Sequence, residues 1–126
     1  MKTVLIIEDN DNNMYMMRFI VDKLGHAVLE ARDGAGGVAL AREKKPDLIL
    51  MDIQLPVMDG YTATRRIREE KDLAAVPIIA VTSYAMVGDR EKAIEAGCTD
   101  YVEKPIDPAA FIKVLEKHIQ RTGEGR

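Results

Sequence analysis

Short apolar runs and stretches with helical periodicity alternate along the whole chain. The apolar runs are Thr3–Ile7, Ala27–Ala31, Leu48–Met51, Pro77–Val81 and Asp100–Val102. Runs of this length between helical patterns are typical of strands that are joined by crossover helices. The alternation therefore predicts an α/β fold in which the strands form one parallel sheet.

Two of the helices have clear ends in the sequence. The pattern predicts a helix over Asn10–Leu24, because apolar residues recur on one face and Gly25 follows its last turn. The last helix starts at Asp107, an acid suited to the N-cap, with Pro108 in the first helical position. We expect this helix to close the domain near Arg121.

The helix between the second and third strands has weaker support. Gly36 and Gly37 lie inside it. Each glycine costs about 1 kcal/mol against alanine in a helix interior. We therefore expect this helix to start late or to fray.

The polarity of the runs predicts the order of the strands. The first, third and fourth runs are continuously apolar, as strands covered on both faces are. Glu30, Asp100 and Glu103 make the second and fifth runs more polar, which fits the edges of the sheet. With right-handed crossovers, the order 2-1-3-4-5 gives a doubly wound, flavodoxin-like parallel sheet of five strands.

Composition limits the class of protein. The 126 residues fit one domain, which we expect over residues 1–122, followed by a short polar tail at 123–126. A formal net charge of -3 with 31% charged residues gives no reason to expect nucleic acid or a lipid surface as partner. No apolar stretch approaches the ~20 residues of a membrane-spanning helix. Cys98 is the single cysteine and no signal segment precedes the first run, so we expect a cytoplasmic protein.

Polar side chains stand where the predicted strands end. They are Glu8 and Asp9 after the first strand, Asp52 after the third, Thr82 after the fourth and Lys104 after the fifth. The carboxyl ends of parallel strands meet at one edge of a sheet, so these side chains should converge. Three ionised carboxylates repel one another unless a cation lies among them, and Mg²⁺ accepts such oxygens while keeping sites for water or phosphate. A lysine and a hydroxyl beside the acids suit a transferring phosphoryl group.

Four segments carry a resemblance to a known family. IIEDN, LILMDIQLPVMDG, AVTSYA and DYVEKPI, in this order and spacing, resemble the response-regulator receiver domain, which has the CheY-like (βα)5 fold, over essentially the whole chain. Within that family, MDIQLP and VPIIAVTSYAMVGD look most like stand-alone cell-cycle receivers. The resemblance implies a two-component phosphorelay switch whose only chemistry is its own phosphotransfer and autodephosphorylation, and not an enzyme.

The resemblance assigns roles to the acids. It implies that Asp52 takes a phosphoryl group from a partner's phosphohistidine, since carboxylates can act as nucleophiles in this way. Asp9, Asp52 and the backbone carbonyl of Gln54 would bind Mg²⁺, and Glu8 would assist through water. Glu8 stands where aspartate is commoner in the family, so we expect its longer side chain to shift the metal geometry.

Other roles follow from the same resemblance. Thr82 would hydrogen-bond the phosphoryl group, Lys104 would pair with it, and Tyr101 would turn inward as Thr82 moves. The peptide bond between Lys104 and Pro105 would be cis, an isomer that costs little before proline.

The loop after Asp52 also matches the family. Pro56 and Gly60 would shape it, and Gln54 and Tyr84 stand at positions that tune how fast the phosphoryl group is lost. In the second helix, Gly37 departs from the usual alanine.

The implied partners are proteins. The phosphoryl donor would be a sensor histidine kinase, a histidine phosphotransfer protein or both. A downstream protein target would recognise the surface formed by the fourth helix, the fifth strand and the fifth helix, where phosphorylation changes the population of two conformations.

Two other function classes fit less well. A metal-dependent phosphohydrolase also forms an aspartyl phosphate, but such enzymes need a second acid two residues after the nucleophile, where this chain has Gln54. A nucleotide-binding module would need a glycine-rich turn after the first strand, whereas EDNDNN would repel phosphates. Taken singly, Asp52 could be a strand-end cap and Tyr101 an edge-strand aromatic, so the interpretation depends on the combination.

Basic and histidine residues outside these segments have ordinary explanations. Arg65, Arg66, Arg68 and Lys71 make the third helix basic, which is typical of a solvated face. His118 lies on the last helix, where we expect a structural histidine.

Overall fold

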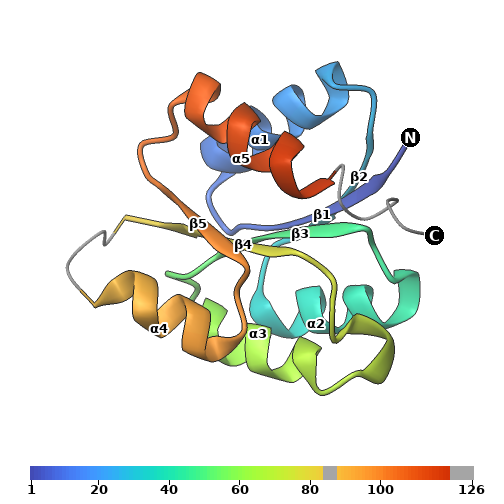
Figure 1. The fold of residues 1–126 in the computed structure, drawn as a ribbon, viewed down its shortest axis with the longest axis vertical. Coiled ribbons are helices and arrows are strands. Elements are labelled where there is room, and N and C mark those ends of the chain that lie inside the picture. The colour runs from blue at the N-terminus through green and yellow to red at the C-terminus, as the bar shows by residue number, and fades with distance from the viewer. Residues whose placement is uncertain (84–87, 120–126) are drawn as a thin grey trace.

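Strands and helices alternate along the chain as the pattern predicts (Figure 1). The structure, a computed structural model, describes residues 1–83 and 88–119. The strands are β1 Thr3–Ile7, β2 Ala27–Ala31, β3 Leu48–Asp52, β4 Ile78–Thr82 and β5 Asp100–Glu103. The helices are α1 Asp11–Lys23, α2 Gly34–Lys44, α3 Gly60–Arg68, α4 Asp89–Ala96 and α5 Pro108–Ile119, with a 3-10 turn at Lys71–Leu73.

The sheet has the predicted order. All neighbouring pairs are parallel and the order is β2-β1-β3-β4-β5, so the two more polar strands are the edges. Strands β3 and β4 each run one residue further than the apolar pattern indicated, because Asp52 pairs with Val81 and Thr82 with Glu103 in the ladder. Asp52 and Thr82 are therefore held by sheet hydrogen bonding and do not lie in loops.

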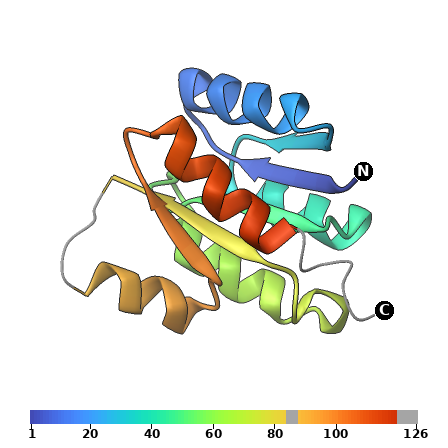
Figure 2. The same cartoon turned by 45° about the horizontal axis from the view of Figure 1, so that its top comes forward.

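Helices cover both faces of the sheet. Figures 1 and 2 show α1 and α5 on one face and α2, α3 and α4 on the other. Side chains alternate along a strand, so Val4 and Ile6 of β1 pack in the α1–α5 cluster and Leu5 and Ile7 pack in the opposite one. Residues on both faces of β1, β3 and β4 are buried, which explains their continuously apolar sequences.

The ends of α1 and α5 agree with the sequence. Asn10 is the N-cap of α1 and its side chain accepts a hydrogen bond from the backbone N–H of Asn13 at 2.9 Å. Asp107 does the same for Ala110 at 3.2 Å before α5 starts at Pro108. The expected end near Arg121 and the tail at 123–126 lie outside the described residues.

Helix α2 corrects the expectation of a late or frayed start. It begins at Gly34, ahead of both interior glycines, and Asp33 caps it by accepting a hydrogen bond from the Gly36 N–H at 2.7 Å. Gly37 fits because it lies against β1: a Cβ there would be 2.4 Å from Cδ1 of Ile7. Close packing on the sheet and the cap outweigh the low helix propensity of glycine.

Arg68 corrects the expectation of a solvated basic face on α3. Its guanidinium donates to the carbonyls of Gly97 at 2.9 Å and Leu73 at 2.8 Å, and burial lowers its pKa. Arg65 and Arg66 are exposed, as expected. Arg68 therefore ties the end of α3 to the segment that follows α4.

His118 is structural, as the sequence indicated. The ring is buried and its Nε2 lies 2.9 Å from Oδ2 of Asp100, which connects α5 to the start of β5. Although burial acts in the opposite direction, hydrogen bonds from His118 and the Tyr101 N–H hold the pKa of Asp100 below its usual value.

Among the described residues, none of the helices has both the length and the apolar character that crossing a bilayer requires.

Candidate functional site

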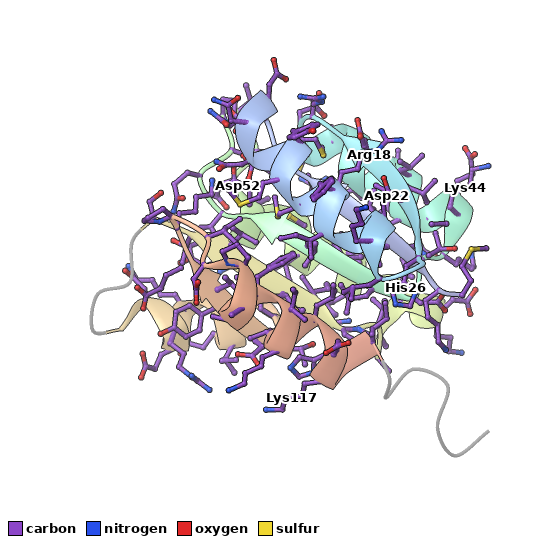
Figure 3. The ribbon with its side chains drawn as sticks, turned by 90° about the horizontal axis from the view of Figure 1, so that it is seen from above. Arg18, Asp22, His26, Lys44, Asp52 and Lys117 are labelled. Carbon is purple, nitrogen blue, oxygen red and sulfur yellow. The ribbon has the colours of Figure 1, made fainter. Side chains whose placement is uncertain are left out.

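The predicted site residues meet at the carboxyl edge of the sheet. Glu8 and Asp9 directly follow β1, Asp52 and Thr82 end β3 and β4, and Lys104 directly follows β5. Figure 3 shows Asp52 at one end of the molecule, whereas His26, just before β2, lies at the other. The parallel topology thus brings together side chains that are far apart in the sequence.

Lys104 binds two buried acids. Its Nζ is 3.1 Å from Oδ1 of Asp52 and 3.3 Å from Oε1 of Glu8. Asp52 is 1% exposed and Glu8 is completely buried, so the ammonium group compensates charge where water does not reach. Sequence reasoning paired Lys104 with a phosphoryl group only. In this structure it already pairs with both acids.

Three carboxylates form a candidate cation site. Glu8, Asp9 and Asp52 each offer an oxygen, and these atoms lie within 4.8 Å of one another. Asp9 is exposed, so the cluster can be reached from solvent. Oδ2 of Asp52 is buried and accepts no hydrogen bond from the described residues, and Oε1 of Glu8 has only its ion-pair contact with Lys104.

Electrostatics at Glu8 also favour a cation. Burial, followed by the neighbouring carboxyl group of Asp52, raises the pKa of Glu8 to about 7, against the opposing effects of the Asn10 N–H and Lys104. The Asn10 N–H donates to Oε2 of Glu8 at 3.1 Å, which ties the carboxyl group of Glu8 to the N-cap residue of α1. Clustered carboxylate oxygens with an uncompensated lone pair fit a hard divalent ion such as Mg²⁺.

Gln54 does more than the sequence indicated. Its backbone N–H donates to Oδ1 of Asp52 at 3.0 Å. Its side chain donates from Nε2 to Oγ1 of Thr82 at 2.8 Å and accepts the Ser83 N–H at 3.0 Å. The sequence predicted only that the Gln54 carbonyl binds Mg²⁺ and that its position affects the lifetime of the phosphoryl group. It could not predict the side-chain bonds, because residues near the ends of two different strands share no local sequence pattern. Tyr84, the other residue named for phosphoryl lifetime, lies outside the described residues.

The loop after Asp52 is tightly built. A Cβ at Gly60 would be 2.4 Å from the carbonyl oxygen of Asp52, so a larger residue there would displace the candidate nucleophile. The Met58 N–H donates to the Pro56 carbonyl at 2.7 Å across Val57, whose φ of 67° makes this a strained γ-turn. Pro56 lies in this loop and Gly60 is at its end, and their role in shaping it stays a prediction. The positive φ of Val57 was not foreseen.

Two further predicted residues flank the site. The Lys104–Pro105 peptide bond is cis, as expected. Tyr101 lies partly buried on β5 with the Arg90 guanidinium 5.5 Å from its ring centroid. The inward turn of Tyr101 stays a prediction.

The family follows from comparison with known proteins. The sequence model of the response regulator receiver domain family matches residues 4–116 of this chain. The chain belongs to the response-regulator receiver family. It is 41% identical over 118 residues to the polar-differentiation response regulator DivK of Brucella anthropi, covering 94% of this chain and 96% of that protein. It is equally similar, over the same shares of both chains, to DivK of Brucella melitensis.

Solved structures agree with the receiver fold. One of them is the receiver domain of the sensor histidine kinase PA1611 from Pseudomonas aeruginosa, which was crystallised with a magnesium ion in its active-site cleft. It is 40% identical to this chain in sequence, and the two structures superpose with a TM-score of 0.87. The match covers 94% of this chain and 98% of that one. The chemotaxis protein CheY4 of Vibrio cholerae is 25% identical, with a TM-score of 0.89 over 94% and 98%. This chain is therefore a CheY-like receiver domain of the two-component response-regulator type. Members of this family are signalling switches and not conventional enzymes.

Proposed function

We propose that Asp52 accepts a phosphoryl group from a phosphohistidine of a partner protein in a Mg²⁺-dependent reaction. One observation carries this assignment: Asp52 is a buried carboxylate that Lys104 and the Gln54 N–H hold by Oδ1, while its Oδ2 accepts no hydrogen bond from the described residues. An oriented carboxylate with one uncommitted oxygen is suited to nucleophilic attack.

The reaction is an exchange of one bond to phosphorus for another. Oδ2 of Asp52 attacks phosphorus, an O–P bond forms and the P–N bond of phosphohistidine breaks. The leaving imidazole nitrogen keeps the electron pair and takes up a proton from water. Asp9, Asp52 and the Gln54 carbonyl would hold Mg²⁺, and Glu8 would assist through water. The ion supplies positive charge that offsets repulsion between the carboxylates and the incoming phosphate.

Side chains of the chain itself complete the site. Lys104 Nζ already lies 3.1 Å from Oδ1 of Asp52, so it can pair with the phosphoryl oxygens. The Thr82 hydroxyl would turn to hydrogen-bond the phosphoryl group, and Tyr101 would turn inward as Thr82 moves. These changes would alter the surface of α4, β5 and α5 for a downstream protein target.

The donor in this proposal is a sensor histidine kinase, a histidine phosphotransfer protein or both. The switch would reset by autodephosphorylation, in which water attacks the phosphoryl group. We place the switch in the cytoplasm, where a protein with the single cysteine Cys98 needs no disulfide.

The competing phosphohydrolase activity has less support. Gln54 stands where such an enzyme needs a general acid, and an amide does not donate a proton to a leaving group. Its side chain is also engaged with Thr82 and Ser83. Such an enzyme would release phosphate over many turnovers, whereas the switch would hold one phosphoryl group per molecule.

The test uses small phosphodonors and intact-protein mass. Incubation with Mg²⁺ and phosphoramidate, which has the P–N bond of phosphohistidine, or acetyl phosphate should add one phosphoryl group to the wild-type protein. A chelator should prevent the addition, and Asp52→Asn should abolish it. Asp59→Asn is the matched control, because Asp59 lies in the same loop and asparagine also caps helices. A phosphoryl group on Asp52→Asn would show that the nucleophile is another residue.

A further inference from the structure

The side chain of Gln54 connects the loop after β3 to the end of β4. Its Nε2 donates to Oγ1 of Thr82 at 2.8 Å, and its Oε1 accepts the backbone N–H of Ser83 at 3.0 Å. Both ends of one planar amide are thus engaged with two consecutive residues. Such a pair of bonds fixes the Thr82 hydroxyl and the Ser83 backbone relative to the β3 loop.

The same residue contacts the phosphoacceptor. The Gln54 N–H donates to Oδ1 of Asp52 at 3.0 Å, the oxygen that Lys104 Nζ also binds at 3.1 Å. On the other side of β4, the Lys104 N–H donates to the Thr82 carbonyl at 2.8 Å. Gln54 and Lys104 therefore both join Asp52 to Thr82, one from each side.

These two links respond differently to a phosphoryl group. Lys104 carries a positive charge, so its attraction to this region increases when phosphate arrives. The Gln54 amide is neutral and uses Oγ1 of Thr82 as an acceptor. A shift of Thr82 toward the phosphoryl group would lengthen that bond, and a shift of Ser83 would lengthen the second. The Gln54 bonds thus favour the unphosphorylated arrangement.

We propose that the Gln54 side chain is a latch that holds Thr82 and Ser83 in the unphosphorylated arrangement and so limits how often the protein activates without phosphate. This proposal rests on the proposed roles of Asp52 and Thr82. Gln54 is a positioning residue in this scheme, because its side chain acts through Thr82. Two hydrogen bonds of ordinary strength bias the ratio of the two arrangements by roughly tenfold or more.

Substitution by methionine separates a latch from a space-filling role. Gln54→Met keeps the length of the side chain and removes both hydrogen bonds. Leu55→Met is the matched control, because it alters packing at the neighbouring buried position of the same loop. Gln54→Ala serves as a second variant that also removes the bonds. All are studied as the full chain, without metal or phosphodonor, by NMR.

Two readouts decide the question. The Ser83 amide should exchange its hydrogen at least about fivefold faster in both Gln54 variants than in the wild-type protein or Leu55→Met. The Thr82 methyl resonance of unphosphorylated Gln54→Met should move toward the position that the wild-type protein shows after treatment with acetyl phosphate and Mg²⁺. A purely structural Gln54 would lower the melting temperature without that directed movement.

Several results would overturn the latch. One is an equal rate of Ser83 amide exchange in the wild type and Gln54→Met, and another is an equally fast exchange in Leu55→Met. The third is a Thr82 methyl resonance that does not move in Gln54→Met. Failure of the proposed function is separately visible, because the wild-type protein would then gain no phosphoryl mass. In that case the latch as a regulatory device fails with it, even if the exchange difference shows that the Gln54 bonds exist in solution.

Discussion

Replacing Glu8 by glutamine should stabilise the metal-free protein at alkaline pH. Glu8 is completely buried beside Asp52, and its ionisation puts a second negative charge where solvent does not compensate it. Glutamine has nearly the same shape, carries no charge and can still accept the Asn10 N–H that Oε2 of Glu8 accepts at 3.1 Å. The variant therefore removes the charge with little change in packing.

The size of the effect follows from the pKa. Burial, and then Asp52, raise the pKa of Glu8 from 4.5 to about 7. Because the folded-state pKa is the higher one, the contribution of Glu8 to stability is complete below pH 4.5 and is lost as pH rises through about 7. The loss amounts to about 3 kcal/mol at pH 8 and to less than about 1 kcal/mol at pH 5.

Urea denaturation in a chelator at pH 5 and pH 8 measures this difference. Glu8→Gln should exceed the wild type in free energy of unfolding by about 3 kcal/mol at pH 8 and by under about 1 kcal/mol at pH 5. Glu95→Gln makes the same chemical change at an exposed position of α4 and should alter neither value. If Glu8→Gln gained no free energy of unfolding at pH 8, or gained equally at both pH values, the ionised Glu8 carboxylate would not be destabilising.

Three further substitutions test the site and its supports. Asp9→Asn should weaken Mg²⁺ binding by more than about tenfold in a calorimetric titration, and an unchanged titration would remove Asp9 from the ligands. Gly37→Ala should lower the free energy of unfolding by about 1–3 kcal/mol in urea denaturation, because the new Cβ would overlap Ile7. Ile7→Val in the Gly37→Ala background should restore part of the loss. A Gly37→Ala variant more stable than the wild type would contradict this packing. Val57→Gly should raise the free energy of unfolding by about 1 kcal/mol, since Val57 is fully exposed and its left-handed backbone suits glycine. A fall in melting temperature would show that the turn is not strained.

The sheet order was predictable because the burial pattern separates edge strands from central strands and right-handed crossovers limit how these strands can be joined. Glu30, Asp100 and Glu103 mark the two edge strands, and the central strands have no charged residue except Asp52 at the end of β3. The convergence of Asp52 with Glu8 and Lys104 follows from that order, since parallel strands bring their carboxyl ends to one edge. This part of the site needs no knowledge of side-chain detail.

The remaining features depend on contacts between segments that have no common sequence pattern. Gly37 reads as a helix breaker until Ile7 is known to lie against it. Arg68 reads as a surface residue until the carbonyls of Gly97 and Leu73 are placed within 3 Å of its guanidinium. Gln54 and Thr82 are brought together only by the pairing of β3 with β4. Propensity and periodicity describe one segment at a time, so they contain none of these pairs.

The unfavourable groups of this domain lie at a single edge, immediately after its best-packed residues. Ile7 and Met51 are fully buried, and the next residue in the sequence after each is an acid of the cluster, Glu8 or Asp52. A cation that binds this cluster in the folded protein, and not in the unfolded chain, must stabilise the fold by mass action. Glu8→Gln already removes part of the repulsion between the carboxylates, so the same Mg²⁺ concentration stabilises the variant less. Mg²⁺ should therefore raise the melting temperature of the wild-type protein more than that of Glu8→Gln, and the reverse order would mean that the cation does not bind among these acids.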